Sequence, residues 1–156
     1  SPDCLEVLYN ELENNKHVDL VYGDCLVTSN KNETFKETKS KTLSEHSIPQ
    51  FSHENMIKCL PGPMPVWTTR MIDKAGFFDD IGHPWVDDWE LWLRSISQGC
   101  VFKKVNKIVG LYLTGGRSQN EENLLEYRKE EARIFFRYKH IFGKNYQKYF
   151  PYFKQF

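Results

Sequence analysis

The sequence lacks the motifs that mark several common classes of protein. It contains no D-x-D motif and no glycine-rich phosphate loop, which are the usual means of holding a nucleoside diphosphate and its metal ion. No apolar stretch approaches the roughly 20 residues that span a bilayer, and no charged and then apolar leader opens the chain. We therefore expect a cytoplasmic location, either free or at the inner face of the membrane.

Cysteine pairs, metal-ligand clusters and net charge are also missing. The four cysteines form no C-x-x-C pair, which excludes a zinc knuckle and a thioredoxin-like motif and favours reduced, mostly buried thiols. The five histidines share no metal-ligand spacing, so no metal site is assigned. Because 21 basic residues balance 21 acidic ones, nucleic acid is not expected as a partner. The cysteines are Cys4, Cys25, Cys59 and Cys100.

What is present indicates one α/β domain over residues 1–156, with a mixed sheet flanked by helices. Apolar residues at helical spacing predict an amphipathic helix over residues 1–15. A β-branched and aromatic run over residues 18–28 predicts a strand with a bend or bulge near Gly23. The polar residues 29–55 are expected to form a hairpin tip or mobile loop.

The second half of the chain predicts two helices, two strands and a third helix. Three prolines within residues 59–67 predict an extended segment, and the helix after it should be capped by Thr68 or Thr69 and end at Gly76. A turn is expected over residues 79–82. The remaining predictions are a helix over residues 87–98, strands over 101–105 and 108–113, and a helix over 121–142 with Leu125, Ala132, Phe135 and Phe142 inward, closed by Gly143.

The most informative segment is an acidic pair, Asp87 and Asp88, at the expected start of a helix that contains three tryptophans within or beside it. A carboxylate in this place can act as a general base toward a hydroxyl, and indole rings can stack on sugars. The pair also has a purely structural interpretation. Asp87 and Glu90 match a D-x-x-E capping box, which stabilises a helix by about 1 kcal/mol without any catalysis.

Several motifs occur in an order that resembles the second half of family 2 glycosyltransferases, which have the GT-A fold. In that family a helix closes on a G-x-F-D motif, and an acidic pair follows with W-x-L-W-L-R and a glycine at the helix end. The resemblance covers residues 1 to about 120. The matching stretches are Met64 to Trp67, Arg70 to Asp79, Asp87 to Arg94, Gly99 and Tyr112.

The resemblance implies an inverting enzyme that moves a sugar from a nucleotide-diphosphate donor to a glycan or lipid-linked acceptor, as in bacterial-type polysaccharide synthesis. It implies that Asp88 is the base, with Asp87 as its neighbour and helix cap where the family usually has Glu. Trp89 and the loop of Gly62, Pro63 and Met64 would form the wall of the substrate site.

The family's D-x-D motif would precede the helix that opens at Ser1, and its carboxylates hold a divalent cation, Mn²⁺ or Mg²⁺. We therefore expect that the nucleotide-binding half is absent, that this chain alone is inactive, and that the apolar surface so left favours a homo-oligomer. Many relatives also carry a histidine near residues 112–118. Arg117 could contact the diphosphate instead, and an equally good interpretation makes it a solvated turn residue.

The last stretch, about residues 121–156, is expected to be a C-terminal helix and an aromatic tail. Aromatic and basic residues alternate in this tail, as they do at membrane interfaces, although packing of the tail against its own domain or a second copy is favoured. Two rivals to an enzyme remain. One is a carbohydrate-binding or assembly module, and the other is a structural domain whose tryptophans are all core.

Overall fold

The computed structural model of the chain describes residues 1–41, 45–78, 85–115 and 123–156. The turn expected over residues 79–82 lies outside these ranges. In chain order the elements are α1 (Cys4–Asn14), β1 (Leu20–Thr28), α2 (Phe35–Ser40), β2 (Glu45–His46), the 3₁₀ helix η1 (Glu54–Ile57), β3 (Val66–Trp67), α3 (Thr69–Ala75), α4 (Asp87–Ser97), β4 (Phe102–Leu113), α5 (Leu124–Arg137) and α6 (Asn145–Phe153).

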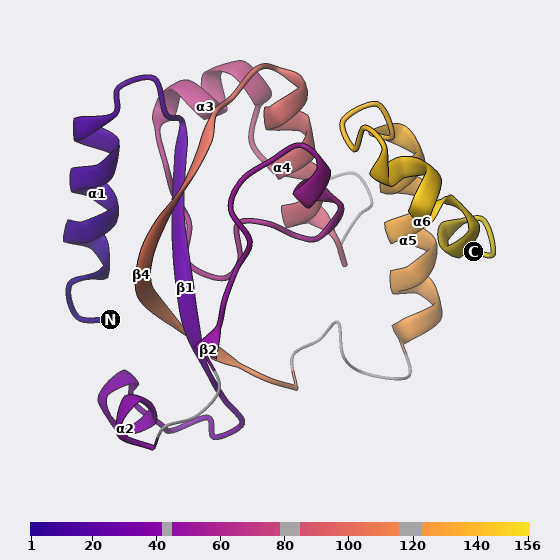
Figure 1. Cartoon of the computed structure of the whole chain (residues 1–156). Helices are drawn as coiled ribbons and strands as arrows, with labels where there is room; N and C mark the ends of the chain where they lie inside the picture. Colours follow the sequence, from indigo (N-terminus) through magenta and orange to yellow (C-terminus); the bar gives the residue numbers. More distant parts are fainter. Residues whose placement is uncertain (42–44, 79–84, 116–122) are drawn as a thin grey trace.

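The expected α/β class is confirmed, with one mixed sheet built around β1 (Figure 1). Strand β4 runs parallel along one edge of β1, and β2 and β3 pair antiparallel with β1 at opposite ends of its other edge. The bulge expected near Gly23 is confirmed by register shifts on either side of Asp24. A Cβ on Gly23 would lie 2.6 Å from the carbonyl oxygen of Lys107, so only glycine allows the two strands to approach this closely.

The prediction of two strands over 101–105 and 108–113 was wrong, because β4 is one strand from Phe102 to Leu113. The ladder with β1 absorbs the extra residues of β4 as bulges, so the pairing continues instead of stopping. The residues between the two expected strands instead form the irregular middle of β4.

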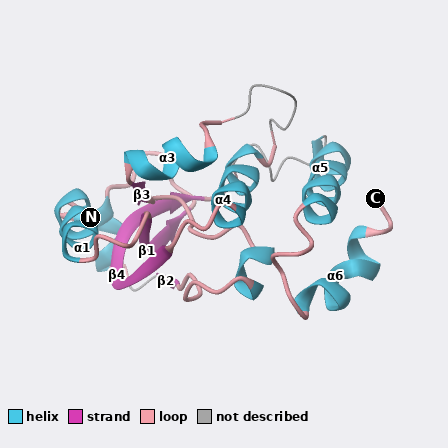
Figure 2. Ribbon diagram, turned by 90° about the horizontal axis from the view of Figure 1, so that it is seen from above, coloured by secondary structure: helices cyan, strands magenta, loops and turns pink. Residues whose placement is uncertain are grey.

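The sheet separates two apolar clusters, so the molecule has three layers (Figure 2). Side chains alternate along β1: Leu20 and Tyr22 join the cluster under α3, α4 and α5, whereas Val21 joins the cluster under α1. The helix predicted over residues 1–15 is present as α1. It buries the i, i+4, i+8 stripe of Cys4, Leu8 and Leu12 and leaves Leu5 and Tyr9 exposed.

The polar segment over residues 29–55, expected to form a hairpin tip or mobile loop, connects β1 to its antiparallel neighbour β2, and it also contains a helix, α2, that was not expected. Helix α2 begins with a capping box that the sequence shows as T-x-x-E. The Thr34 hydroxyl accepts from the Glu37 backbone N–H, and the Glu37 carboxylate accepts from the Thr34 backbone N–H at 2.8 Å. A local hydrogen-bond pattern therefore formed a helix in a segment with almost no apolar periodicity.

Helix α3 confirms both of its expected ends. The Thr68 side chain caps it by accepting from the Met71 backbone N–H at 3.3 Å, and Gly76 terminates it. Helix α4 begins at Asp87 as expected, but the predicted capping role of Asp87 was wrong. Val86 is the N-cap residue, with no side-chain capping bond. Glu90, the other half of the expected box, turns into the protein interior.

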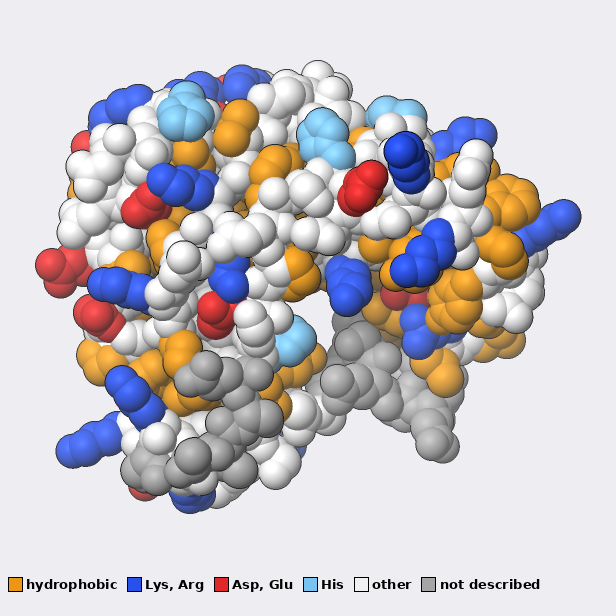
Figure 3. Space-filling view, in the orientation of Figure 1, with side chains coloured by type: hydrophobic (Ala, Val, Ile, Leu, Met, Phe, Trp, Pro, Cys, Tyr) orange, Lys and Arg blue, Asp and Glu red, His pale blue; other side chains and the backbone are white. Residues whose placement is uncertain are grey.

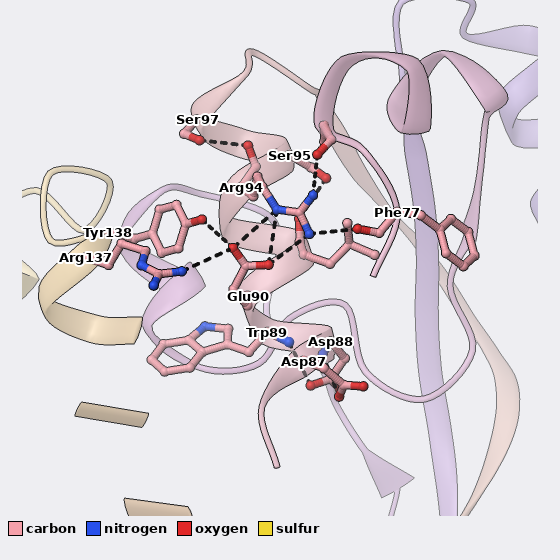
Figure 4. A network of polar contacts seen from close by, with 12 residues as sticks. Phe77, Asp87, Asp88, Trp89, Glu90, Arg94, Ser95, Ser97, Arg137 and Tyr138 are labelled. Atoms are coloured by element: carbon pink, nitrogen blue, oxygen red, sulfur yellow. Dashed lines mark hydrogen bonds and ion pairs between the residues drawn. The ribbon is translucent and has the colours of Figure 1, made fainter. Parts of the chain in front are cut away.

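The Glu90 carboxylate is buried and ties three helices together (Figure 4). It accepts from the Arg94 guanidinium one turn later, at 3.1 Å from Nε and 2.9 Å from Nη2. The same guanidinium donates to the carbonyl oxygens of Ala75 and Phe77 at the end of α3. The Tyr138 hydroxyl, just after α5, donates to Glu90 as well, and burial together with the Glu90 charge raises the pKa of Tyr138 to about 12.

The C-terminal segment packs back onto its own domain. Helix α5 ends at Arg137 rather than near residue 142, and Leu125 is exposed rather than inward, whereas Ala132 and Phe135 are buried as expected. The Phe135 ring stacks on Phe142 and on Phe153 of α6, with ring centroids 5.3 and 4.2 Å apart. None of the helices in the described part of the chain is long and apolar enough to cross a membrane.

The buried network predicts a large loss of stability on substitution of Glu90. We expect Glu90→Gln to lower the free energy of unfolding by about 2–4 kcal/mol, because the half-buried Arg94 loses its counter-charge. Urea denaturation followed by circular dichroism measures this loss. The matched control is Glu126→Gln, which removes an exposed partner of Lys129 and should cost less than about 0.5 kcal/mol. Equal effects of the two variants would contradict the structural role of Glu90.

Candidate functional site

The acidic pair lies in the first turn of α4, which buried side chains on either side of it hold in place. Val86 and Trp89 are both 3% exposed, and the Trp89 indole N–H donates to the Met56 carbonyl oxygen at 2.8 Å. Asp87 accepts from the Asp88 backbone N–H at 2.9 Å, and Asp88 accepts from the Trp89 backbone N–H at 2.7 Å. Both carboxylates thus meet free amide groups at a helix N-terminus, where negative charge is favoured.

A cavity of about 610 Å³ opens beside Asp88, between the sheet-bearing half of the molecule and α5. Figure 3 shows the surface hollowed between these two halves. Asp88 lines the cavity, whereas Asp87 does not, so the structure separates two carboxylates that the sequence leaves equivalent. The lining residues are His46, Ile57, Lys58, Cys59, Gly62, Pro63, Trp85, Val86, Asp88, Trp89, Tyr112, Tyr127 and Glu131.

A thiol and a carboxylate are paired in this cavity. The Cys59 Sγ donates to Oδ2 of Asp88 over 3.4 Å. Asp88 is exposed to solvent at the cavity. The protein packed around the carboxylate nevertheless raises its pKa above the usual value, although hydrogen bonds from the Trp89 backbone and Cys59 oppose the rise. The protein packed around the Cys59 thiol, added to the negative charge of Asp88, raises the pKa of Cys59 well above its usual value, although the residue is exposed at the surface. Asp88 is therefore a carboxylate that accepts a proton more readily than one in water.

The loop of Gly62, Pro63 and Met64 departs from the extended segment expected over residues 59–67, because the chain turns at residues 60–61 and bends at Pro63. The loop contributes unequally to the cavity. Gly62 and Pro63 line it, whereas Met64 lies against Gly110 of β4. Gly62 has φ +76°, and a Cβ there would lie 2.3 Å from Cδ1 of Ile48. Glycine is therefore required for the loop to pass over Ile48 and reach the cavity.

Helix α5 supplies a wall of the cavity that we had not expected from the sequence. Tyr127 and Glu131 both face the cavity, one turn apart, and the Glu131 carboxylate accepts from the Arg128 guanidinium. Burial and the nearby Glu131 charge raise the pKa of Tyr127 above its usual value. The i, i+4 spacing of these two polar residues is the one sequence signal that places them on a common side.

The tryptophans divide between core and cavity. The Trp89 ring, expected in the substrate wall, lines the cavity floor but is 3% exposed and stacks on Phe142 with centroids 6.2 Å apart. Its faces are thus occupied by protein. Trp85 is half-buried and lines the cavity, and its backbone N–H donates to Glu130 at 3.2 Å. Arg117, expected near the diphosphate, lies outside the described residues.

Comparison with models of known protein families and with curated protein sequences found no match to this chain. The interpretation of the site therefore depends on its own geometry and on the motif resemblance described above.

The described lining of the cavity does not form a site for a divalent cation. Among residues 1–41, 45–78, 85–115 and 123–156, no group of three His, Cys, Asp or Glu side chains is placed to hold a metal ion. The two carboxylates among the described lining residues already have partners, Asp88 with Cys59 and Glu131 with Arg128. The D-x-D ligands implied by the resemblance are absent from the sequence, and we assign no step to a metal in this chain.

The thiol–carboxylate pair predicts slow alkylation of Cys59. Of the four free cysteines, all within the described residues, Cys59 alone is exposed, so iodoacetamide should label this thiol first. We expect the reaction at pH 8 to be at least about tenfold slower than that of a peptide thiol, because a raised pKa leaves less thiolate.

Substitution of Asp88 tests whether its negative charge helps to raise the pKa of Cys59. Asp88→Asn should speed labelling of Cys59 several-fold, as measured by mass spectrometry. Asp87→Asn, the matched control, should change the rate less, because Asp87 makes the weaker contribution to the Cys59 pKa. An unchanged rate in Asp88→Asn would show that the pair does not form.

Proposed function

We propose that this chain forms the acceptor side of an inverting glycosyltransferase with a GT-A fold, and that Asp88 is its general base. The observation that carries the proposal is the position of Asp88. Of two adjacent carboxylates, it is the one that lines a cavity, and its pKa is raised. The order of the G-x-F-D, acidic-pair and W-x-L-W-L-R motifs supports the same assignment.

The chemistry requires one base and no protein nucleophile. Asp88 takes the proton of an acceptor hydroxyl while that oxygen forms a bond to the anomeric carbon of the donor sugar. The bond from this carbon to the diphosphate breaks on the opposite face, the nucleoside diphosphate leaves, and the configuration inverts. The donor would be held by a nucleotide-binding half preceding Ser1, as the resemblance implies. On this proposal, residues 1–156 alone do not complete the reaction.

The polar groups of the cavity can bind the hydroxyl groups of an acceptor sugar. Asp88 and Glu131 can accept hydrogen bonds from sugar hydroxyls, and Trp85 and Tyr127 offer aromatic surface beside them. An acceptor with a carboxylate or phosphate at the reacting sugar would be repelled by Asp88 but attracted by Lys58, which also lines the cavity. The rival binding module receives less support, because protein covers the faces of the Trp89 ring.

The first test is transfer by the chain expressed together with its upstream sequence. Wild-type protein and Asp88→Asn are compared for turnover of a panel of nucleotide sugars, with Mn²⁺ and a panel of neutral oligosaccharides. We expect Asp88→Asn to lower turnover roughly 10²- to 10⁴-fold, because asparagine cannot accept the proton.

The control for this test is Asp87→Asn, which alters the other carboxylate of the pair and should lower turnover far less. Equal losses in both variants would remove the distinction on which the proposal rests. Oligosaccharide binding that survives Asp88→Asn, without any turnover in the wild type, would instead support the carbohydrate-binding module.

The hydrogen bond from Cys59 predicts a shift in pH dependence. A base works when deprotonated, so activity should fall as the pH drops through the pKa of Asp88. Cys59→Ala removes a bond that lowers this pKa, and the acidic limb of kcat/KM should therefore move to higher pH. Cys59→Ser keeps a donor and should leave the limb near its wild-type position. A limb that moves to lower pH in Cys59→Ala would contradict the pairing.

A further inference from the structure

Charge is unevenly distributed along this neutral chain. Residues 132–156 contain six basic residues and no acidic residue, so residues 1–131 carry the compensating excess of six acids. The basic segment, which is described throughout, comprises the second half of α5, the turn after it and α6. In Figure 3 Lys and Arg side chains lie among hydrophobic ones over the part of the surface where α5 and α6 lie. The C-terminal segment therefore carries a net positive charge although the chain as a whole is neutral.

Helix α6 has an inner side that belongs to the core. Tyr146 and Phe153 stack on Phe135 of α5, with centroids 5.3 and 4.2 Å away, and Phe150 meets Phe136 edge-on at 5.7 Å. These contacts fix α6 against the domain and therefore determine which of its side chains lie on the outer side. The favoured interpretation of the aromatic tail, packing onto its own domain, is thus confirmed for this side.

The outer side of α6 presents Lys148 and Tyr152 one turn apart, with Lys144 just before the helix and Phe156 three residues after it. We call these four residues the outer stripe; both lysines are exposed, and Tyr152 and Phe156 are 38% and 42% exposed. The rings of Tyr152 and Phe156 contact each other with centroids 5.7 Å apart. The guanidinium of Arg128 lies 5.8 Å from the centre of the Tyr152 ring and adds a cation beside it. The stripe presents lysines at one end and two aromatic rings at the other.

We propose that this stripe is a membrane-contacting surface that binds bilayers containing anionic lipids. Lysine ammonium groups are attracted to anionic headgroups, and amphipathic aromatic rings favour the boundary between headgroups and acyl chains. The helix lies along the bilayer surface, since no described helix is suited to cross it. The proposal is independent of the catalytic role of Asp88.

Charge decides between a lipid surface and the other occupants of such a stripe. A second copy related by a two-fold axis would place the lysines of one stripe over the aromatic rings of the other, and it would supply no negative charge to the lysines. Double-stranded nucleic acid satisfies the lysines but offers no apolar layer for Tyr152 and Phe156. An anionic bilayer satisfies both kinds of side chain.

Vesicle co-sedimentation of residues 1–156 tests the proposal. Wild-type chain is mixed with vesicles of phosphatidylcholine alone and with vesicles that contain 30% phosphatidylglycerol. We expect binding to the anionic vesicles that weakens with added salt, and little binding to the neutral ones. Lys144→Gln with Lys148→Gln should weaken binding about 25-fold, at about fivefold for each lysine near the surface. A separate double variant, Tyr152→Ser with Phe156→Ser, should weaken the vesicle binding that remains at high salt.

The matched control is Lys36→Gln with Lys39→Gln, which makes the same change in net charge on α2, far from α6 (Figure 1). This variant should bind anionic vesicles as the wild type does. Equal losses in both lysine pairs, equal binding to neutral and anionic vesicles, or no binding would overturn the proposal. So would a dimer that Tyr152→Ser dissociates, or DNA binding as tight as vesicle binding. Circular dichroism confirms that each variant remains folded.

Discussion

A single buried carboxylate, that of Glu90, holds together the part of the fold on which the candidate site depends. Its two oxygens are satisfied by the Arg94 guanidinium and the Tyr138 hydroxyl, and Arg94 in turn holds the end of α3. Two residues along a helix are about 200° apart, so Glu90 and Asp88 point to opposite sides of α4. The hydrogen bonds of the inward-facing Glu90 carboxylate therefore fix the direction in which Asp88 faces the cavity.

Local patterns predicted the elements whose causes are local. Thr68 and Gly76 bound α3 because capping and termination depend on neighbouring residues, and the strand around Gly23 followed from β-branched and aromatic side chains. One missed element, α2, also has a local cause, the capping box of Thr34 and Glu37. The other errors came from longer-range causes. β4 continues through its irregular middle because β1 already lies beside it, and the expected box of Asp87 and Glu90 did not form because Arg94 and Tyr138 compete for the Glu90 carboxylate.

The candidate site was predictable along α4 and at Gly62 and Pro63, which line the cavity as expected. Asp88 lines the cavity that the motif led us to expect, but its partner Cys59 lies 29 residues earlier in the chain, and Tyr127 and Glu131 come from a helix beyond the family resemblance. Trp89 illustrates the same limit: composition suggested a sugar-stacking ring, whereas tertiary packing placed Phe142 against it. Which tryptophan face is free depends on what the chain folds against it, and periodicity does not contain this information.

Helix α5 connects the two proposed surfaces. Its Arg128 donates to Glu131 on the cavity wall and lies beside the Tyr152 ring of the outer stripe, so one side chain touches both. If the acceptor is attached to a lipid, the stripe holds the protein at the surface where that lipid resides, and diffusion to the cavity is confined to two dimensions. A water-soluble acceptor gains nothing from this arrangement. The dependence of transfer on anionic vesicles, compared between lipid-linked and soluble forms of one acceptor sugar, therefore distinguishes the two substrate classes.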